Sequence, residues 1–199
     1  MKALIYNSGL GKRMGDLTKN NPKSMVKLLN HETIFERQLR VLSECGINEV
    51  IVTVGPFKEQ LINMQNKFPN IKFTFVENSD YENTNYIYSM YLAREYLDDD
   101  FILLHGDLVF NRELLQKVIN SPKRNLVTIN REKALPEKDF KGRIVDGKLR
   151  EVSINIFDDN CFALQPLYKL DKETLNKWVS KVVEFINNGT NKCYAENAL

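Results

Sequence analysis

The first fifteen residues, MKALIYNSGLGKRMG (1–15), place a short apolar strand directly before a basic, glycine-rich loop. Residues 3–6 are apolar or aromatic, which is typical of a short buried strand. Gly9, Gly11 and Gly15 follow closely, although the whole chain has only nine glycines. Because glycines let successive backbone N–H groups converge on an anion, this stretch predicts a strand that leads into an anion-binding loop.

Downstream of this loop the apolar pattern alternates between strand-like and helix-like segments. Thr33 and Glu36 form a capping-box pattern, and Gly46 ends the helix that follows. We expect strands at 3–6, 49–54, 71–76, 101–104 and 125–129, an extended piece at 24–29, and helices at 33–46, 57–68, 85–97 and 111–120. Strands joined by helical crossovers predict an α/β fold with a doubly wound, mostly parallel, Rossmann-like sheet.

The second half of the chain has a different pattern. Asp146-Gly147 is a hairpin turn signal between two short strand-like runs, and a strand at 161–168 precedes a helix at 171–188. These features predict a small antiparallel lobe. We therefore expect a single domain over 1–199, with a core over 1–130 and a lobe over 131–199 that returns to the core.

Composition excludes several classes of protein. The 199 residues include 28 Lys or Arg and 26 Asp or Glu, with a net charge of +2, and no long basic stripe indicates nucleic-acid binding. Three cysteines without a C-x-x-C pair argue against a disulfide framework or a structural zinc site. No apolar stretch approaches the roughly 18 residues of a membrane span. A soluble protein of a reducing cytoplasm is expected.

The glycine loop carries its own positive charge. Lys12 and Arg13 lie within it and Lys23 follows Pro22, so the loop is suited to a triphosphate. It is neither a P-loop, because no Gly-Lys-Ser/Thr follows, nor a dinucleotide fingerprint, because Met14 occupies the third glycine position. The alternative interpretation is a tight turn with solvated basic residues.

An aspartate follows the apolar run at 101–104. Asp107 comes after His105-Gly106, at a strand end where a carboxylate can bind Mg²⁺. The alternative is a turn or capping aspartate. The chain has only His31 and His105 as histidines, too few and too far apart to indicate a metal cluster.

These motifs together resemble a known superfamily. The evidence is G-x-G-x-R followed by P-K, and an aspartate that ends a later strand, together with the stretches TIFERQL (33–39), YENTNYIYSM (81–90), LHGD (104–107) and YAENAL (194–199). The chain resembles the nucleotidyltransferase superfamily, and within it the branch of phosphocholine cytidylyltransferases. Members typically carry Ala-Ala before the first glycine, where this chain has Asn7-Ser8.

The resemblance implies the fold above, Mg²⁺ as cofactor and a role for each matching residue. Lys23 and Arg13 would be catalytic, by neutralising charge on the phosphates, and Asp107 and Glu196 would hold Mg²⁺. The implied nucleotide-binding residues are Asn7, Ser8, Gly9, Gly11, Lys12, Arg13, Asn85 and Ser89. As alternatives, Asn85 would merely cap a helix, and Glu196 would be a plain surface carboxylate.

The acceptor lobe is less specific. Lys138, in a charged loop, would bind the acceptor phosphate, unless that loop is simply solvated. An aromatic cage for a trimethylammonium group has its candidates in this lobe, namely Phe140, Phe157, Phe162, Tyr168 and Trp178.

The resemblance implies transfer of CMP from CTP to a small phosphorylated alcohol such as phosphocholine, with release of pyrophosphate. One alternative is a sugar-1-phosphate nucleotidyltransferase that uses UTP or dTTP. A second is a nucleotide-sensing domain without catalysis. A homo-oligomer, or a domain of a longer polypeptide, is compatible with each of these.

Overall fold

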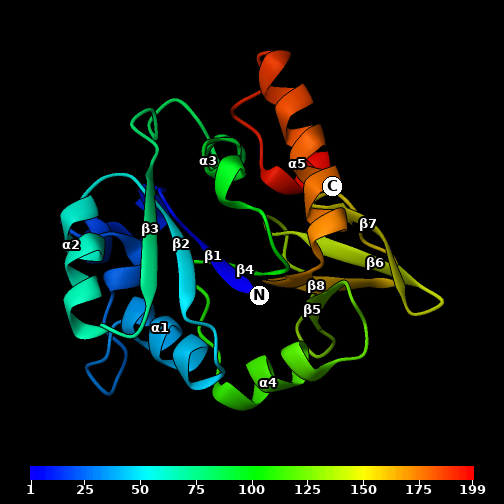
Figure 1. Cartoon of the computed structure of the whole chain (residues 1–199). Coiled ribbons are helices and arrows are strands. Elements are labelled where there is room, and N and C mark those ends of the chain that lie inside the picture. The colour runs from blue at the N-terminus through cyan, green and yellow to red at the C-terminus, as the bar shows by residue number, and fades with distance from the viewer.

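A computed structural model describes the backbone of all 199 residues and every side chain except that of Arg13. Strands and helices alternate in the first part of the chain, and strands dominate the second part before a long helix (Figure 1). The elements are β1 (Lys2–Asn7), α1 (Ile34–Glu44), β2 (Glu49–Val54), α2 (Lys58–Ile62), β3 (Lys72–Glu77), α3 (Tyr86–Ala93), β4 (Phe101–His105), α4 (Arg112–Asn120), β5 (Leu126–Asn130), β6 (Lys141–Val145), β7 (Lys148–Ser153), β8 (Cys161–Leu170) and α5 (Lys172–Asn187). Short 3₁₀ helices lie at Lys12–Thr18, Lys23–Met25, Asn63–Lys67, Arg94–Tyr96 and Ala195–Ala198.

All eight strands belong to one mixed sheet. The order is β3-β2-β1-β4-β8-β6-β7, and β5 pairs with β8. The pairs among β3, β2, β1 and β4 are parallel, whereas β8 runs antiparallel to β4, β5 and β6. The predicted α/β fold with an antiparallel lobe is confirmed, and the long strand β8 joins the two parts into one continuous sheet.

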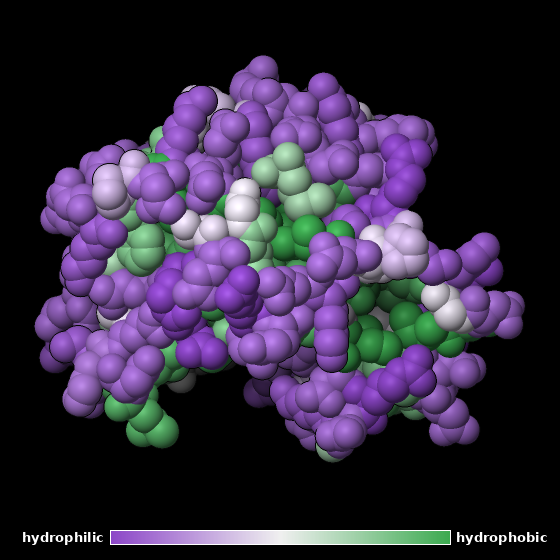
Figure 2. Space-filling view, turned by 60° about the horizontal axis from the view of Figure 1, so that its bottom comes forward, coloured by the Kyte–Doolittle hydropathy of each residue, from purple (hydrophilic) through white to green (hydrophobic). Residues whose placement is uncertain are grey.

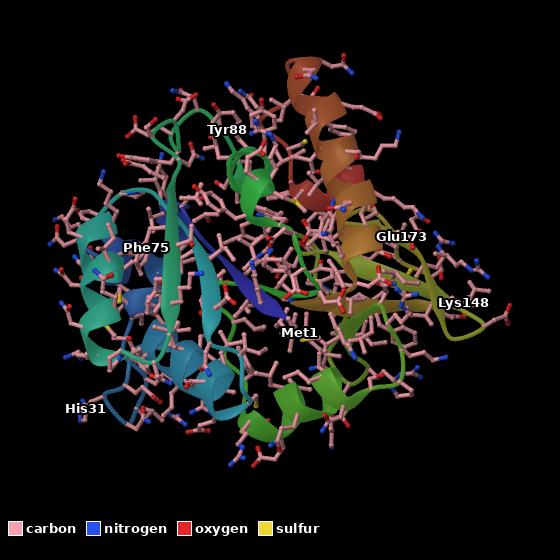
Figure 3. All side chains as sticks on the ribbon, in the orientation of Figure 1. Met1, His31, Phe75, Tyr88, Lys148 and Glu173 are labelled. Carbon is pink, nitrogen blue, oxygen red and sulfur yellow. The ribbon has the colours of Figure 1, made fainter. Side chains whose placement is uncertain are left out.

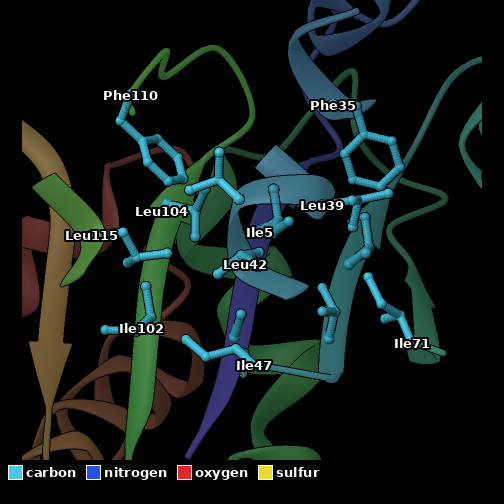
Figure 4. Packing of buried hydrophobic residues seen from close by; sticks show 14 of the residues in the cluster. Ile5, Phe35, Leu39, Leu42, Ile47, Ile71, Ile102, Leu104, Phe110 and Leu115 are labelled. Atoms are coloured by element: carbon cyan, nitrogen blue, oxygen red, sulfur yellow. The ribbon is translucent and has the colours of Figure 1, made fainter. Parts of the chain in front are cut away.

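Helices cover both faces of the parallel part of the sheet (Figure 1). Successive side chains of a strand point to opposite faces, so Ala3 and Ile5 of β1 pack toward α1 and α4, and Leu4 and Tyr6 pack toward α3 and α5. Figure 4 shows the first of these two cores, where Ile5 lies among apolar side chains of α1, α4 and β4. Full burial of each large aliphatic side chain contributes about 1.5–3 kcal/mol. The two cores hold the carboxyl ends of β1 and β4 side by side.

Local signals fix the ends of several elements. The Thr33 hydroxyl accepts a hydrogen bond from the Glu36 N–H, and the Glu36 carboxylate accepts one from the Thr33 N–H, which confirms the capping box at α1. Asp146 and Gly147 both have positive φ angles, of 52° and 68°, which is the backbone twist of a tight hairpin between β6 and β7. Asn111 caps α4, as the sequence indicates.

Two expected segments differ from the structure. Residues 24–29 are not a continuous extended piece, because Pro22 begins a 3₁₀ turn in which the Met25 N–H donates to the Pro22 carbonyl. Within this segment only Lys27 forms a β-bridge, and its partner is Thr33. The helix expected at 57–68 is α only to Ile62 and continues as 3₁₀ to Lys67.

The molecular surface is mainly hydrophilic on the side that carries α1 and α4. Figure 2 brings this side forward and shows apolar residues largely in recesses between polar ones. No helix in the described residues has the length and apolar character needed to cross a membrane.

Candidate active site

A cavity of ≈ 390 Å³ opens at the carboxyl ends of β1 and β4, between the parallel core and the antiparallel lobe. Ligands of open α/β sheets bind beyond the carboxyl ends of the strands. Among the residues singled out from the sequence, seven with an expected catalytic, nucleotide, metal or acceptor-phosphate role line this cavity, namely Ser8, Gly9, Lys23, Asn85, Asp107, Lys138 and Glu196. The fold therefore brings residues from both ends of the chain to one site.

The Lys23 and Asp107 side chains form an ion pair in the cavity wall. Lys23 Nζ lies 2.8 Å from an Asp107 carboxylate oxygen, and the two side chains are 21% and 42% exposed. Burial acts to raise the pKa of the Asp107 carboxyl, but the Lys23 ammonium outweighs it and holds that pKa below its ordinary value. Asp107 is therefore ionised at neutral pH and able to bind a cation, while Lys23 can turn to an incoming phosphate.

The glycine loop approaches its neighbours closely. A Cβ atom on Gly55, at the end of β2, would lie 2.4 Å from the Ser8 backbone oxygen, so glycine is required there. A Cβ on Gly106 would collide with the Asn7 side chain. Apart from its two chain neighbours, no described atom lies within 4 Å of the Cβ position of Gly9, and Gly9 lines the cavity, which leaves its backbone open to a ligand.

A chain of hydrogen bonds supports one wall of the cavity. The Ser8 and Ser89 hydroxyls share a hydrogen bond of 2.6 Å, and the Asn78 amide donates to Ser89 at 3.1 Å and to the Thr84 hydroxyl at 3.0 Å. Asn85 caps α3 through the Tyr86 N–H, and it also lines the cavity. Both interpretations of Asn85 therefore agree with its position.

Ser89 differs from the expectation of a direct contact with the nucleotide. It is fully buried and lies behind Ser8 rather than in the cavity wall. We expect Ser89→Ala to lower the free energy of unfolding by about 1–3 kcal/mol, because the Ser8 and Asn78 side chains each lose a buried hydrogen-bond partner.

Chemical denaturation would measure this loss of stability. Ser180→Ala is a suitable control, because Ser180 is exposed on α5 and, among the described residues, its hydroxyl donates only to the Asn176 carbonyl. Equal stability of the two variants would contradict a supporting role for Ser89.

The opposite wall is aromatic around a buried carboxylate. The Glu196 side chain is 1% exposed, and its two oxygens accept hydrogen bonds from the Tyr86 hydroxyl and, at 2.9 Å, from the Tyr168 hydroxyl. His105 Nε2 lies 3.7 Å from the carboxylate. Burial acts to raise the pKa of Glu196, but His105 and the Tyr86 hydroxyl keep it below its ordinary value. A negative charge therefore lies at the hydroxyl ends of the Tyr86 and Tyr168 side chains.

Several other expected residues lie outside the cavity wall. Asn7 is buried beneath the loop, Gly11 packs against Thr18 and Lys23, and Lys12 is exposed. The expected catalytic and nucleotide-binding roles of Arg13 concern a side chain that lies outside the described part of the structure.

The candidate aromatic residues of the lobe separate into two groups. Phe140 and Tyr168 line the cavity, whereas the other three do not. Trp178 is buried and donates to the Ala195 carbonyl, Phe162 contacts Arg131, and Phe157 contacts Lys141.

Sequence reasoning did not identify four further cavity residues, Tyr6, Asn78, Thr84 and Tyr194, as functional. Tyr6 has the pattern of a strand residue buried in the core. Asn78 directly follows β3, so its place at a strand end was the one available signal.

The donor set at Asp107 suits Mg²⁺. Mg²⁺ prefers oxygen ligands and is usually held by one or two carboxylates together with substrate phosphates, and Asp107 offers an ionised, accessible carboxylate beside the glycine loop. Glu196 fits less well, because both its oxygens accept tyrosine hydroxyls and almost none of its side chain is exposed. Among the described residues, no group of three or more His, Cys, Asp or Glu side chains could hold a metal ion.

The fold and the site together define the class of NTP-transferase proteins, with an open α/β sheet, a glycine loop after β1 and a Lys-Asp pair at strand ends. The chain belongs to the MobA-like NTP transferase domain family, whose model matches residues 3–141.

Curated relatives include cytidylyltransferases. The chain is 37% identical over 110 residues to choline-phosphate cytidylyltransferase of Streptococcus pneumoniae, a match that covers 55% of this chain and 46% of that protein. It is 31% identical over 137 residues to CTP:phosphoglutamine cytidylyltransferase of Campylobacter jejuni, which covers 66% of this chain and 53% of that protein. The chain thus spans about half the length of these relatives.

A solved structure of CTP:phosphocholine cytidylyltransferase from Streptococcus pneumoniae has a similar fold. It matches with a TM-score of 0.78 and 27% identity, over 99% of this chain and 82% of that chain.

Proposed function

We propose that this protein transfers CMP from CTP to a small phosphorylated acceptor and releases pyrophosphate. An oxygen of the acceptor phosphate attacks the α-phosphorus of CTP and forms a new P–O–P linkage. The bond from the α-phosphorus to the bridging oxygen breaks, and its electron pair leaves with pyrophosphate. The acceptor is already an anionic nucleophile at neutral pH, so the protein has mainly to align the reactants and stabilise charge.

The observation that carries this proposal is the Lys23-Asp107 pair, which lies between the glycine loop and the acceptor lobe. Backbone N–H groups of the loop at Gly9 are suited to hold the triphosphate. Lys23 would leave Asp107 for the phosphates and stabilise charge as pyrophosphate departs. Asp107 would hold Mg²⁺, which supplies charge neutralisation when bound.

The choice of CTP rests on the relatives and on the polar wall. Both curated relatives described above are named for cytidylyl transfer. Ser8, Asn78, Thr84 and Asn85 place hydroxyl and amide groups along one wall of the cavity, and such groups can pair with the polar edge of a small pyrimidine.

The acceptor is proposed to carry a cationic group at the end remote from its phosphate. The Tyr86 and Tyr168 hydroxyls donate hydrogen bonds to the Glu196 carboxylate. The negative charge of this carboxylate adds to the attraction that the aromatic rings exert on a cation. Lys133 and Lys138 lie in the same cavity and would meet the acceptor phosphate. In this proposal Glu196 recognises the acceptor rather than the metal.

A substrate panel tests the proposed function. The full chain is incubated with each nucleoside triphosphate and with phosphocholine, phosphoethanolamine, phosphoglutamine or glucose-1-phosphate, with Mg²⁺ or with EDTA, and pyrophosphate release is measured. We expect turnover with CTP, Mg²⁺ and a cationic acceptor. A preference for UTP or dTTP with the sugar phosphate would select the sugar nucleotidyltransferase instead, and CTP binding without turnover would select the sensor.

Removal of the Glu196 charge tests the acceptor assignment. We expect Glu196→Gln to raise the KM for a cationic acceptor by about tenfold, which is the effect of losing roughly 1.4 kcal/mol of cation attraction, and to leave the KM for CTP within about twofold. Glu184→Gln is the control, because Glu184 is exposed on α5 and pairs only with Lys181 among the described side chains. If the KM for CTP rose and the KM for the acceptor did not, Glu196 would belong to the nucleotide or metal site.

A further inference from the structure

A buried lysine lies behind the loop that forms the acceptor side of the cavity. Lys141 begins β6 and is 0% exposed. Its Nζ donates to the backbone carbonyls of Pro136 at 2.5 Å and of Asp139 at 3.2 Å, and it lies 4.0 Å from the centre of the Phe157 ring. A buried ammonium is costly unless such groups compensate it, so its position depends on the conformation of this loop.

The loop that Lys141 holds contributes directly to the cavity wall. Five of its residues line the cavity, namely Lys133, Pro136, Lys138, Asp139 and Phe140. The Phe140 ring packs edge-on against the Tyr194 ring at 5.2 Å, and Tyr194 is two residues from Glu196. Lys141 thus binds two backbone carbonyls of a loop whose residues also line the cavity, beside the aromatic wall.

A second loop supports the same ammonium from the other side. Phe157 lies in the connection between β7 and β8, and the Lys141 Nζ bridges its ring to the carbonyls of residues 136 and 139. The cation is therefore attracted by an aromatic face and by two carbonyl dipoles at once. Neither loop belongs to a regular element. The Lys141 ammonium restrains residues 133–140 together with the hydrogen bond from the Leu164 N–H to the Phe140 carbonyl.

We propose that Lys141 is a positioning residue, which holds the loop of residues 133–140 in the conformation that forms the acceptor side of the cavity. Lys141 does not contact the acceptor itself. Its action is on Lys138 and Phe140, which the loop presents to the cavity. The kinetic part of this inference rests on the proposed function, whereas the loop restraint does not.

Lys141→Met keeps the length of the side chain and removes the N–H donors and the charge. We expect amide hydrogen exchange at Leu164, whose N–H donates to the Phe140 carbonyl at 3.0 Å, to accelerate by about tenfold or more, because the restraint on the loop is lost, while exchange in β1 and β4 stays unchanged. With an active enzyme, we expect the KM for the acceptor to rise by about tenfold and the KM for CTP to stay within about twofold, since each tenfold corresponds to roughly 1.4 kcal/mol.

Two further variants complete the test. Lys148→Met is the matched control, because Lys148 is exposed at the hairpin tip of the same lobe, where Figure 3 shows it at the edge of the molecule. Phe157→Leu removes only the aromatic face, and since Phe157 is 57% exposed it keeps the assay usable if Lys141→Met does not fold. We expect a smaller change in the same direction from Phe157→Leu and none from Lys148→Met.

The possible failures are distinguishable. Unchanged exchange at the Leu164 amide in Lys141→Met would overturn the inference, as would an equal rise of both KM values in an active variant. If neither the wild type nor any variant turns over a member of the substrate panel, the proposed function fails, and hydrogen exchange alone then decides the role of Lys141.

Discussion

Lys23→Ala is expected to lower kcat for pyrophosphate release by about 10²–10³-fold, the usual effect of removing one group that stabilises transition-state charge. The Lys23 ammonium lies in the cavity wall, 2.8 Å from Asp107, where no other described basic group pairs with that carboxylate. Steady-state kinetics with CTP and the acceptor would measure the loss. Lys19→Ala is the control, because Lys19 is an exposed lysine of the same segment that lies outside the cavity wall.

The same substitution has a consequence for the pH profile. Lys23 holds the pKa of the Asp107 carboxyl below its ordinary value, so its removal raises that pKa. Asp107 then becomes protonated at a higher pH, and residual activity that needs the carboxylate disappears earlier as the pH falls. The acid limb of kcat/KM should therefore move to higher pH in Lys23→Ala. Full activity with an unchanged acid limb would contradict both the catalytic role and the importance of the ion pair.

Gly55→Ala is expected to destabilise the fold and to weaken nucleotide binding. The new Cβ would lie 2.4 Å from the Ser8 carbonyl oxygen, and because both positions belong to the backbone, no change of rotamer relieves the collision. The end of β2 and the glycine loop must separate. We expect a loss of about 1–3 kcal/mol in the free energy of unfolding, as for overpacking in a core, and a rise of about tenfold in the Kd for CTP.

Gly9→Ala provides the comparison for this prediction. A Cβ on Gly9 would meet no described atom within 4 Å beyond its two chain neighbours, but Gly9 lines the cavity. Gly9→Ala should therefore keep the stability of the wild type and weaken only CTP binding, as thermal unfolding and calorimetric titration would show. If Gly55→Ala proved as stable as Gly9→Ala, the close approach of β2 to the loop would not constrain the site.

The local features of the site were predictable because each depends on neighbours in sequence. A glycine loop after an apolar strand indicates anion binding, and an aspartate after a later strand indicates a group at the same edge of the sheet. Asp107 and Gly9 accordingly line one cavity. The capping box at Thr33 and the turn at Asp146-Gly147 likewise need only a few consecutive residues.

The roles of Ser89 and Glu196 could not be predicted in the same way. Ser89 shares its hydrogen bond with Ser8, 81 residues away, and the sequence pattern of α3 does not indicate which side chain lies behind the loop. Glu196 follows α5 near the end of the chain, and its environment depends on tyrosines 28 and 110 residues distant. Its burial and its two tyrosine partners fit the expected role in metal binding poorly.

The sequence by itself determined the α/β class, the glycine-rich loop after the first strand and the antiparallel lobe, because periodicity, caps and turns are encoded over short stretches of chain. The tertiary structure alone decided which side chains share the cavity. Strand pairing brings the end of β1 beside β4, and β8 carries the lobe against them. Side chains such as Tyr6 and Lys141 gained their positions only there, because burial and hydrogen-bond partners depend on contacts between distant segments.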